Sequence, residues 1–503
     1  MKKALIVGAA VFALLTAAVL VLPAFVDLGR FKDTYLPLVE ETLHRRIDVG
    51  EVRLSLVPAP SIKLSKLKVS GMPAFPADSF FAAQEVQLRL KLWPLLRGRF
   101  EITELVLDNP VFTLQKQSNG SSSDGDLASK KAPPSTRHGI SKLSKQQDSA
   151  SAALIIPDRL RIKDGQLNIV TAGRTPVRIQ GIGLFMEEFS SEKPFPYRAT
   201  FDYPGLKTVT LTGQLDYQEE QATLTLKENR LTVQNLTLPL EGKISNLASA
   251  PRFDLLLADE NIDARPVMQI LALFGLAPPD TEISGPMVLR IAVSGPSTNL
   301  MTQIQGQFKN VKLYDKRAIK GNLNGAVSLR LPVGGGSDVI QQLRGAGQLS
   351  AREGELTNAD LIKKVQRATG LIGFSQHERR EATTFKTLDT EFTLVNGVVD
   401  FKRIYLLNPQ LELNGGGTMT LSRQALNIGM EATLSPQPSA RASHGRTSEF
   451  FKNRRGRLVV PLTVTGDAEN PAVNIDNGKL AQRGATPSMQ KSLATFFRQL
   501  FRR

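Results

Sequence analysis

Apolar and polar residues alternate with a period of two through most of this 503-residue chain. Clear examples are residues 52–56, 86–92, 105–107 and 224–238. Successive side chains of a β-strand point to opposite faces, so this alternation predicts strands with one polar and one apolar face. We therefore expect a mainly β protein built on an antiparallel sheet.

The amino-terminal residues follow a different pattern. Lys2 and Lys3 precede an uncharged apolar segment, residues 4–25, which is long enough to cross a bilayer. Lysines at this position indicate a cytoplasmic amino terminus and export of the remaining chain. We interpret residues 1–27 as a signal-anchor transmembrane helix. A cleaved signal peptide is the alternative, but the apolar run is long and no small-x-small site follows it.

Charge and cysteine content restrict the partners of an exported body. The formal net charge is +16, and the chain has no cysteine. Stability must then come from burial and strand pairing, because disulfides are impossible. For an exported, tethered protein, anionic lipid head groups are more available than nucleic acid, and no nucleic-acid-binding motif accompanies the charge. We expect phospholipid contact and no nucleic-acid partner.

Changes in composition divide the chain into six expected segments. They are the anchor (1–27), an N-terminal helix and strands (28–116), a linker (117–152), a central β region (153–345), a C-terminal β region (346–478) and a basic end (479–503). The linker is rich in Ser, Gly, Lys and Gln and cannot bury enough apolar surface to fold, so disorder is expected there. A second polar stretch, 435–446, is expected to be a loop.

Glycine-containing motifs interrupt the alternation. Three of them pair an acidic or amide residue with glycine, which suits positive φ and predicts tight hairpin turns. These pairs are Asp164-Gly165, Glu353-Gly354 and Asn396-Gly397. Gly345-Ala346-Gly347 is also expected at a hairpin turn, since the third glycine of a dinucleotide fingerprint is missing. The glycine runs 334–336 and 415–417 are expected at turns or bulges.

Few segments have helical spacing. A helix is expected over 28–46, another over 265–274 after Pro266, and a third over 359–368 capped by Asn358. Residues 488–503 predict a short basic amphipathic helix. Its apolar face, expected to contact the sheet end, a membrane or a partner, contains Leu493, Phe496, Phe497, Leu500 and Phe501.

The sequence contains no motif that indicates catalysis. The chain has no G-x-S-x-G, and none of its four histidines accompanies a nucleophile-elbow sequence. No cysteine or histidine pair has the spacing of a zinc site. The histidines are His44, His138, His377 and His444. We expect no enzymatic activity, no catalytic residue, no metal and no cofactor.

The apolar strand faces are the remaining candidates for a functional surface. They either pack against other parts of the fold or line an open trough. Both arrangements place apolar residues at every second position, so the alternation does not distinguish them. Covering helices are scarce, which favours self-closure or a lined groove. Candidate lining residues are Leu224, Leu226, Leu231, Val233, Leu236 and Leu238. Because a one-residue register shift inverts a strand, the sequence does not decide which residues face inward.

Two groups of segments resemble the AsmA family of Gram-negative, inner-membrane-anchored periplasmic proteins. The first group comprises residues 30–32, 51–60, 86–102 and 107–110, and the second comprises 347–356, 384–388, 396–399, 414–421 and 458–471. The chain departs from the family at residues 42–46, where a Thr-Gly-Arg step is common. It departs again at Asn119-Gly120, where Gly-x-x-Asn-Trp is common.

The resemblance implies a long, strongly curved antiparallel sheet that forms an elongated, taco-like groove with an apolar interior and few covering helices. It also implies a periplasmic body that binds or conducts phospholipids between the inner and outer membranes and supports outer-membrane protein assembly. The C-terminal end would then meet the outer membrane or envelope assembly proteins. The alternative is a non-enzymatic envelope scaffold that binds assembly factors and carries no lipid.

Overall fold

The structure is a computed structural model. It describes residues 45–117 and 157–482, together with Glu40 and Ser123. Within these ranges the residues left out are 56–58, 72–74, 76–78, 92, 95–100, 174–175, 248–250, 274–276, 278–280, 298, 316–318, 334–338, 357–382, 437–451 and 469–470.

Several sequence-based expectations fall outside the described residues. They include the anchor, nearly all of the helix over 28–46 and of the linker, the helix over 359–368, the glycines 334–336, all four histidines and the amphipathic C-terminal helix with Leu493, Phe496, Phe497, Leu500 and Phe501. Of the loop over 435–446, the structure describes Ser435 and Pro436 alone. These expectations stay predictions.

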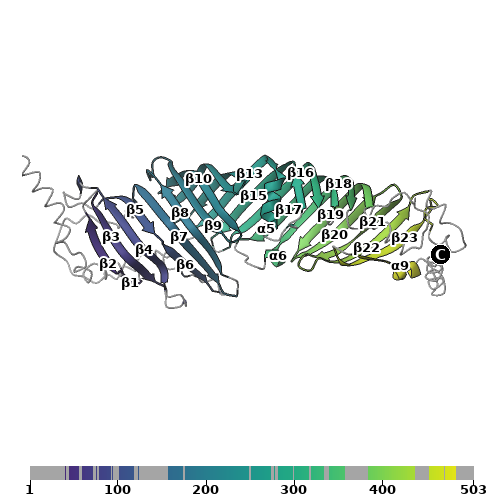
Figure 1. Cartoon of the computed structure of the whole chain (residues 1–503), viewed down its shortest axis with the longest axis horizontal. Helices are drawn as coiled ribbons and strands as arrows, with labels where there is room; N and C mark the ends of the chain where they lie inside the picture. The colour runs from purple at the N-terminus through teal and green to yellow at the C-terminus, as the bar shows by residue number, and fades with distance from the viewer. Residues whose placement is uncertain are drawn as a thin grey trace, which may run out of the picture. The chain divides into compact units, whose positions relative to one another are not determined.

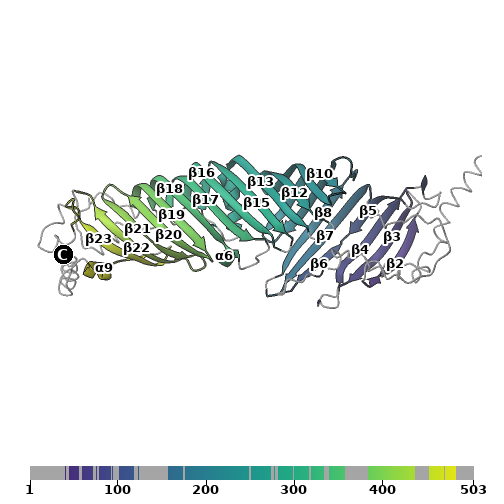
Figure 2. The ribbon, with the colours of Figure 1, turned by 180° about the vertical axis from the view of Figure 1, so that it is seen from behind.

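The described chain is mainly β, as the alternation predicts, and its 24 strands belong to one sheet. The chain divides into two compact units. Unit 1 comprises residues 1–255 and 294–300, and unit 2 comprises residues 256–293 and 301–503. In each unit, neighbouring strands lie side by side in the views of Figures 1 and 2. The two units are described separately.

Unit 1 contains a run of strands that pair mostly with their neighbours in the chain. The strands are β1 (Ile47–Asp48), β2 (Glu51–Ser55), β3 (Ser61–Ser70), β4 (Ser79–Leu90), β5 (Ile102–Asp108), β6 (Val111–Lys116), β7 (Arg159–Thr171), β8 (Val177–Met186), β9 (Phe195–Tyr203), β10 (Leu206–Gln218), β11 (Thr223–Val233), β12 (Leu236–Ser245) and the start of β13 (Arg252–Asp263).

Two of these strands depart from the expected antiparallel order. Both β5 and β6 pair with β4 on one side and run parallel to β7 on the other, so together they occupy one position in the sheet. Asn109, with a φ of 48°, and Pro110 separate them, and the Pro110 carbonyl accepts a hydrogen bond of 2.7 Å from the Gln166 amide. A parallel pair needs a long connection, and the polar segment before β7 is long enough to provide it.

Two of the three expected hairpin turns are wrong. Asp164-Gly165 lies inside β7 and Glu353-Gly354 lies inside β18 (Arg344–Leu356), whereas Asn396-Gly397 does connect two paired strands, β19 (Thr383–Val395) and β20 (Val398–Leu407). The first residue of each pair has positive φ, between 48° and 52°. Positive φ occurs at the first residue of one class of β-bulge as well as in hairpin turns. The motifs therefore indicate the local conformation correctly but not its place in the fold.

Unit 2 has longer strands and most of the described helices. It contains the rest of β13, α5 (Ala264–Leu273), β14 (Thr281–Ser284), most of β15 (Pro286–Pro296), β16 (Met301–Asp315), β17 (Ile319–Pro332), α6 (Val339–Gln342), β18, β19, β20, β21 (Leu411–Thr420), β22 (Ala425–Leu434), β23 (Val459–Asp467), β24 (Ala472–Ile475) and α9 (Asn477–Gln482). Helix α5 confirms the helix expected over 265–274 to within one residue at each end.

Glycines in unit 2 sit where strands approach closely. Gly345-Ala346-Gly347, expected at a hairpin turn, lies within β18, so that expectation is wrong. A β-carbon on Gly347 would lie 2.6 Å from the Phe392 ring, which explains why glycine is needed there. The run 415–417 lies within β21 opposite a register shift in β20, which confirms the bulge alternative.

Gly415 provides a test of this close packing. A β-carbon there would meet the Gly429 carbonyl oxygen at 2.2 Å and the Met430 α-carbon at 2.7 Å, both in the backbone of β22. We expect Gly415→Ala to lower the free energy of unfolding by about 1–3 kcal/mol, measured by urea titration. Gly429→Ala is the control, because its β-carbon would meet only the mobile end of Lys479 at 3.4 Å. Equal losses for both variants would contradict the assignment.

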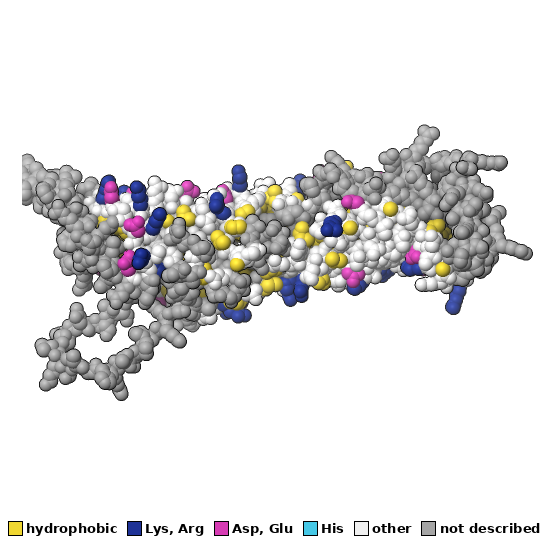
Figure 3. Space-filling view, turned by 90° about the horizontal axis from the view of Figure 1, so that it is seen from below, with side chains coloured by type: hydrophobic (Ala, Val, Ile, Leu, Met, Phe, Trp, Pro, Cys, Tyr) yellow, Lys and Arg dark blue, Asp and Glu magenta, His cyan; other side chains and the backbone are white. Residues whose placement is uncertain are grey.

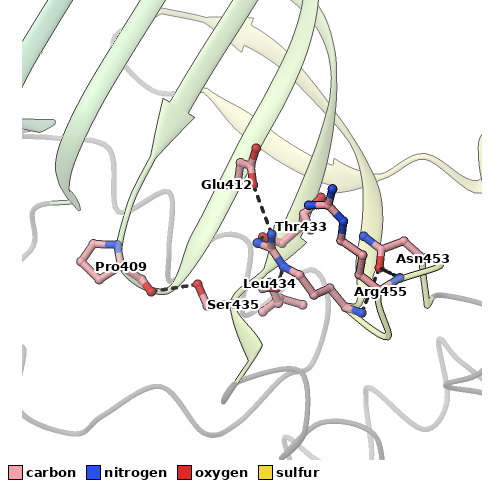
Figure 4. Close-up of polar contacts among 8 residues, drawn as sticks. Pro409, Glu412, Thr433, Leu434, Ser435, Asn453 and Arg455 are labelled. Carbon is pink, nitrogen blue, oxygen red and sulfur yellow. Dashed lines mark hydrogen bonds and ion pairs between the residues drawn. The ribbon is translucent and has the colours of Figure 1, made fainter.

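Polar contacts join the ends of four strands at one edge of unit 2 (Figure 4). The Ser435 hydroxyl donates to the Pro409 carbonyl at 2.8 Å. Arg457 donates to the Leu434 carbonyl at 2.7 Å and lies 3.4 Å from the Glu412 carboxylate. The segment leading into β23 is therefore held against β21 and β22, and the last strands of the sheet keep their register.

Candidate functional site

The apolar faces of neighbouring strands in unit 1 join into one continuous row. Residues directly opposite each other on paired strands share a face, so the row follows from nine successive strand pairings. We call this the unit 1 row, and it consists of Val52, Leu64, Val86, Leu107, Ile162, Leu184, Ala199, Leu211, Leu231 and Leu238. Every member is apolar, and the row crosses ten strands.

The unit 1 row is only partly buried. Val86 and Leu238 are buried, at 6% and 2% exposure, and the other eight members are half-buried. Figure 3 shows hydrophobic side chains scattered over the visible surface, with Lys, Arg, Asp and Glu side chains among them. A row of large aliphatic side chains that stays partly accessible is a surface that gains free energy from an apolar partner.

The six residues proposed from the sequence all lie on this face. Leu231 and Leu238 are members of the row, and the others follow from the same pairings, with Val233 opposite Leu236. Leu226, Val233 and Leu238 are buried, while Leu224, Leu231 and Leu236 are half-buried. Sequence reasoning missed the other members of the row, whose alternation is equally clear in β4, β5 and β8.

A bulge in β11 brings the six residues together. Leu226 and Leu231 are five positions apart, which would put them on opposite faces of a regular strand. Leu226 lies opposite Gly242 and Asn229 lies opposite Leu240, so β11 carries one extra residue there. The Asn229 amide donates to the carbonyls of Lys227 at 2.9 Å and Gln214 at 3.2 Å, which fixes the bulge. The odd spacing between apolar residues was the sequence signal for it.

Two tyrosines on β9 report the polarity of this region. Burial raises the pKa of the Tyr197 and Tyr203 hydroxyls above their ordinary value, because a phenolate is poorly solvated there. Tyr197 and Tyr203 lie two and four positions from Ala199 along β9, so all three side chains are on the same face of the sheet. The phenols are neutral at physiological pH, and the face around them has low polarity.

The opposite face of unit 1 is polar. Thr200, Thr210, Thr232 and Thr237 lie side by side across β9 to β12, with 3.1 Å between the last two hydroxyls. Ser61, Glu104 and Val106 are buried on this face, and the Glu104 carboxylate, which is 2% exposed, lies 2.6 Å from Arg89 and 3.7 Å from Arg161. These charges are paired, so we assign the Glu104 group to stability of the parallel junction of β5 and β7.

Unit 2 has a row with the same construction but a different environment. Its successive pairings join eight strands, β16 to β23. We call it the unit 2 row, and it consists of Val311, Leu323, Ala351, Leu388, Leu406, Leu413, Ala432 and Val460. All members except Leu388 are buried, at 8% exposure or less.

The described part of the chain contains neither a cluster of metal-ligating side chains nor a membrane-spanning helix. No three His, Cys, Asp or Glu side chains in this part of the chain are placed to hold a metal ion. Among the helices the structure describes, none is both long and apolar enough to cross a bilayer.

Comparison with known proteins identifies the family. The sequence model described as the AsmA family matches residues 1–258, which is half of the chain. The chain belongs to the AsmA family. The match includes the N-terminal segments on which the resemblance rests and the whole unit 1 row, whereas the C-terminal segments from 347 onward lie beyond it. No curated protein and no solved structure matches the chain.

Proposed function

We propose that this AsmA-family protein is an inner-membrane-anchored periplasmic protein that binds phospholipids, or conducts them between the inner and outer membranes. In this role it supports outer-membrane lipid homeostasis and protein assembly. The acyl chains would lie along the apolar face of a groove in the sheet, and the anchor in residues 1–27 would hold the body at the inner membrane. No catalytic residue or cofactor is required for this role.

One observation carries the proposal. The unit 1 row is continuous over ten strands and partly exposed, as a surface for acyl chains must be. Strands in a sheet lie about 4.8 Å apart, so ten strands give a row of about 43 Å. Each methylene moved from water onto such a surface contributes about 0.8 kcal/mol. Several acyl chains side by side would therefore bind without any polar recognition.

The test is the lipid content of the full chain. The protein is purified from a bacterial envelope in detergent and is released from its micelle in a native mass spectrometer. We expect it to carry several phospholipids per chain. The masses also give the lipid class. A well-folded chain that carries no phospholipid would contradict the proposal.

The scaffold alternative has one observation in its favour, the buried row of unit 2. A packed interior is what a protein needs when it binds assembly factors through its edges and C-terminal end. A lipid-free, folded chain that captures envelope assembly proteins would support this second function.

A further inference from the structure

We propose that phospholipid contact is confined to unit 1, and that unit 2 fills its apolar face with its own side chains. This inference rests on the proposed function and locates its binding surface. In this proposal unit 2 has a structural role and binds no phospholipid. The lipid must then enter and leave within unit 1.

The first argument is the difference in burial between two rows of the same chemistry. Leu211 and Leu231 of unit 1 are half-buried, whereas Leu406 and Leu413 of unit 2 are each 2% exposed. An acyl chain can touch only atoms that water or lipid can reach. The unit 2 row presents almost none, and its half-buried member, Leu388, lies among buried neighbours.

The second argument is the match between large and small residues on neighbouring strands of unit 2. Gly347 lies against the ring of Phe392, and Gly354 lies against the ring of Phe385, which is 3% exposed. An aromatic ring that lies over a glycine occupies the space that a side chain would otherwise take, so these strands pack closely. Buried residues from β18 to β23 then form one contiguous core.

The third argument is the presence of polar groups on the unit 1 face. Tyr197 and Tyr203 on β9 share that face with the row, and both are half-buried. A surface that meets only its own apolar side chains gains nothing from phenol groups. A surface that meets lipid has hydroxyls and ester oxygens available at the ends of the acyl chains, and neutral tyrosine hydroxyls bond to them.

The absence of cysteine from the chain permits a clean test. Single cysteines replace Leu184 and Leu211 in unit 1 and Ala351 and Ala432 in unit 2, with Thr212→Cys on the polar face as the control. Alanine to cysteine is a small change, and circular dichroism checks that each variant folds. The full chain, stripped of lipid and held in an amphipathic polymer, is treated with N-ethylmaleimide before and after loading with phosphatidylethanolamine and phosphatidylglycerol.

We expect the two unit 1 cysteines to react in the lipid-free protein and to react about tenfold more slowly when nine of ten chains carry lipid. The unit 2 cysteines are expected to react slowly in both states, and Thr212→Cys is expected to react fast in both. Lipid-dependent protection of Ala351→Cys or Ala432→Cys would overturn the confinement to unit 1 while leaving the proposed function intact. Absence of protection at every position, with no lipid bound by mass, would overturn both.

Discussion

Replacing Leu211 with aspartate is expected to remove bound phospholipid from the protein while leaving unit 1 folded. Leu211 is half-buried and lies within the unit 1 row, between Ala199 and Leu231. A carboxylate at this position stays partly solvated in the lipid-free protein, so the fold tolerates it. Contact with acyl chains would desolvate the charge at a cost of about 2 kcal/mol, roughly thirtyfold in affinity.

The measurement is the number of phospholipids per chain by native mass spectrometry, together with the circular dichroism spectrum. Thr212→Asp is the matched control, because the adjacent residue lies on the polar face, opposite Arg198 and Arg230. It should keep its lipid. Leu226 and Val233, at 9% and 8% exposure, are poorer choices, since a buried charge there would destabilise the fold in any case. An unchanged lipid count in Leu211→Asp would contradict the assignment of the row.

The same substitution in unit 2 is expected to have the opposite effect. Leu413 is 2% exposed, packed in the core that extends from β18 to β23. An aspartate there places an unpaired charge in a packed apolar interior and should cost more than about 4 kcal/mol, enough to unfold unit 2 at ordinary temperature. Asn414→Asp, at the exposed neighbouring position, should be close to neutral.

Urea titration and limited proteolysis distinguish these outcomes. For Leu413→Asp we expect rapid cleavage within residues 383–482 and loss of the corresponding unfolding transition. A Leu413→Asp protein that remains protease-resistant, with altered lipid content instead, would mean that the unit 2 face is open. That result would contradict both the packed interior and the confinement of lipid to unit 1.

The strand content and the polarity of the faces could be predicted from the sequence, because alternation acts locally. The bulges could be predicted only in part. Asp164 and Glu353 have the positive φ that their sequence indicates, but whether such a residue lies in a turn or within a strand depends on what pairs on both sides. The odd spacing between Leu226 and Leu231 contained the information for a bulge in β11, since both residues are apolar.

Other features depend on contacts far apart in the sequence. The parallel pairing of β5 and β6 with β7 depends on where the chain returns after the polar segment, which composition does not specify. The unit 1 row is half-buried and the unit 2 row is buried. Apolar and polar residues alternate equally in both units, so the alternation does not predict this difference in burial. Glycines within strands, such as Gly347 and Gly415, were the available sign of tight packing in unit 2.

The most direct test of lipid contact on the unit 1 face is site-specific photocrosslinking in living bacteria. The full chain is made with p-benzoylphenylalanine in place of Leu211 or, on the opposite face, Thr212, and the crosslinked products are identified by mass. We expect a phospholipid adduct at position 211 and none at position 212. Adducts to protein alone, or equal phospholipid adducts at both positions, would contradict an apolar face that holds acyl chains.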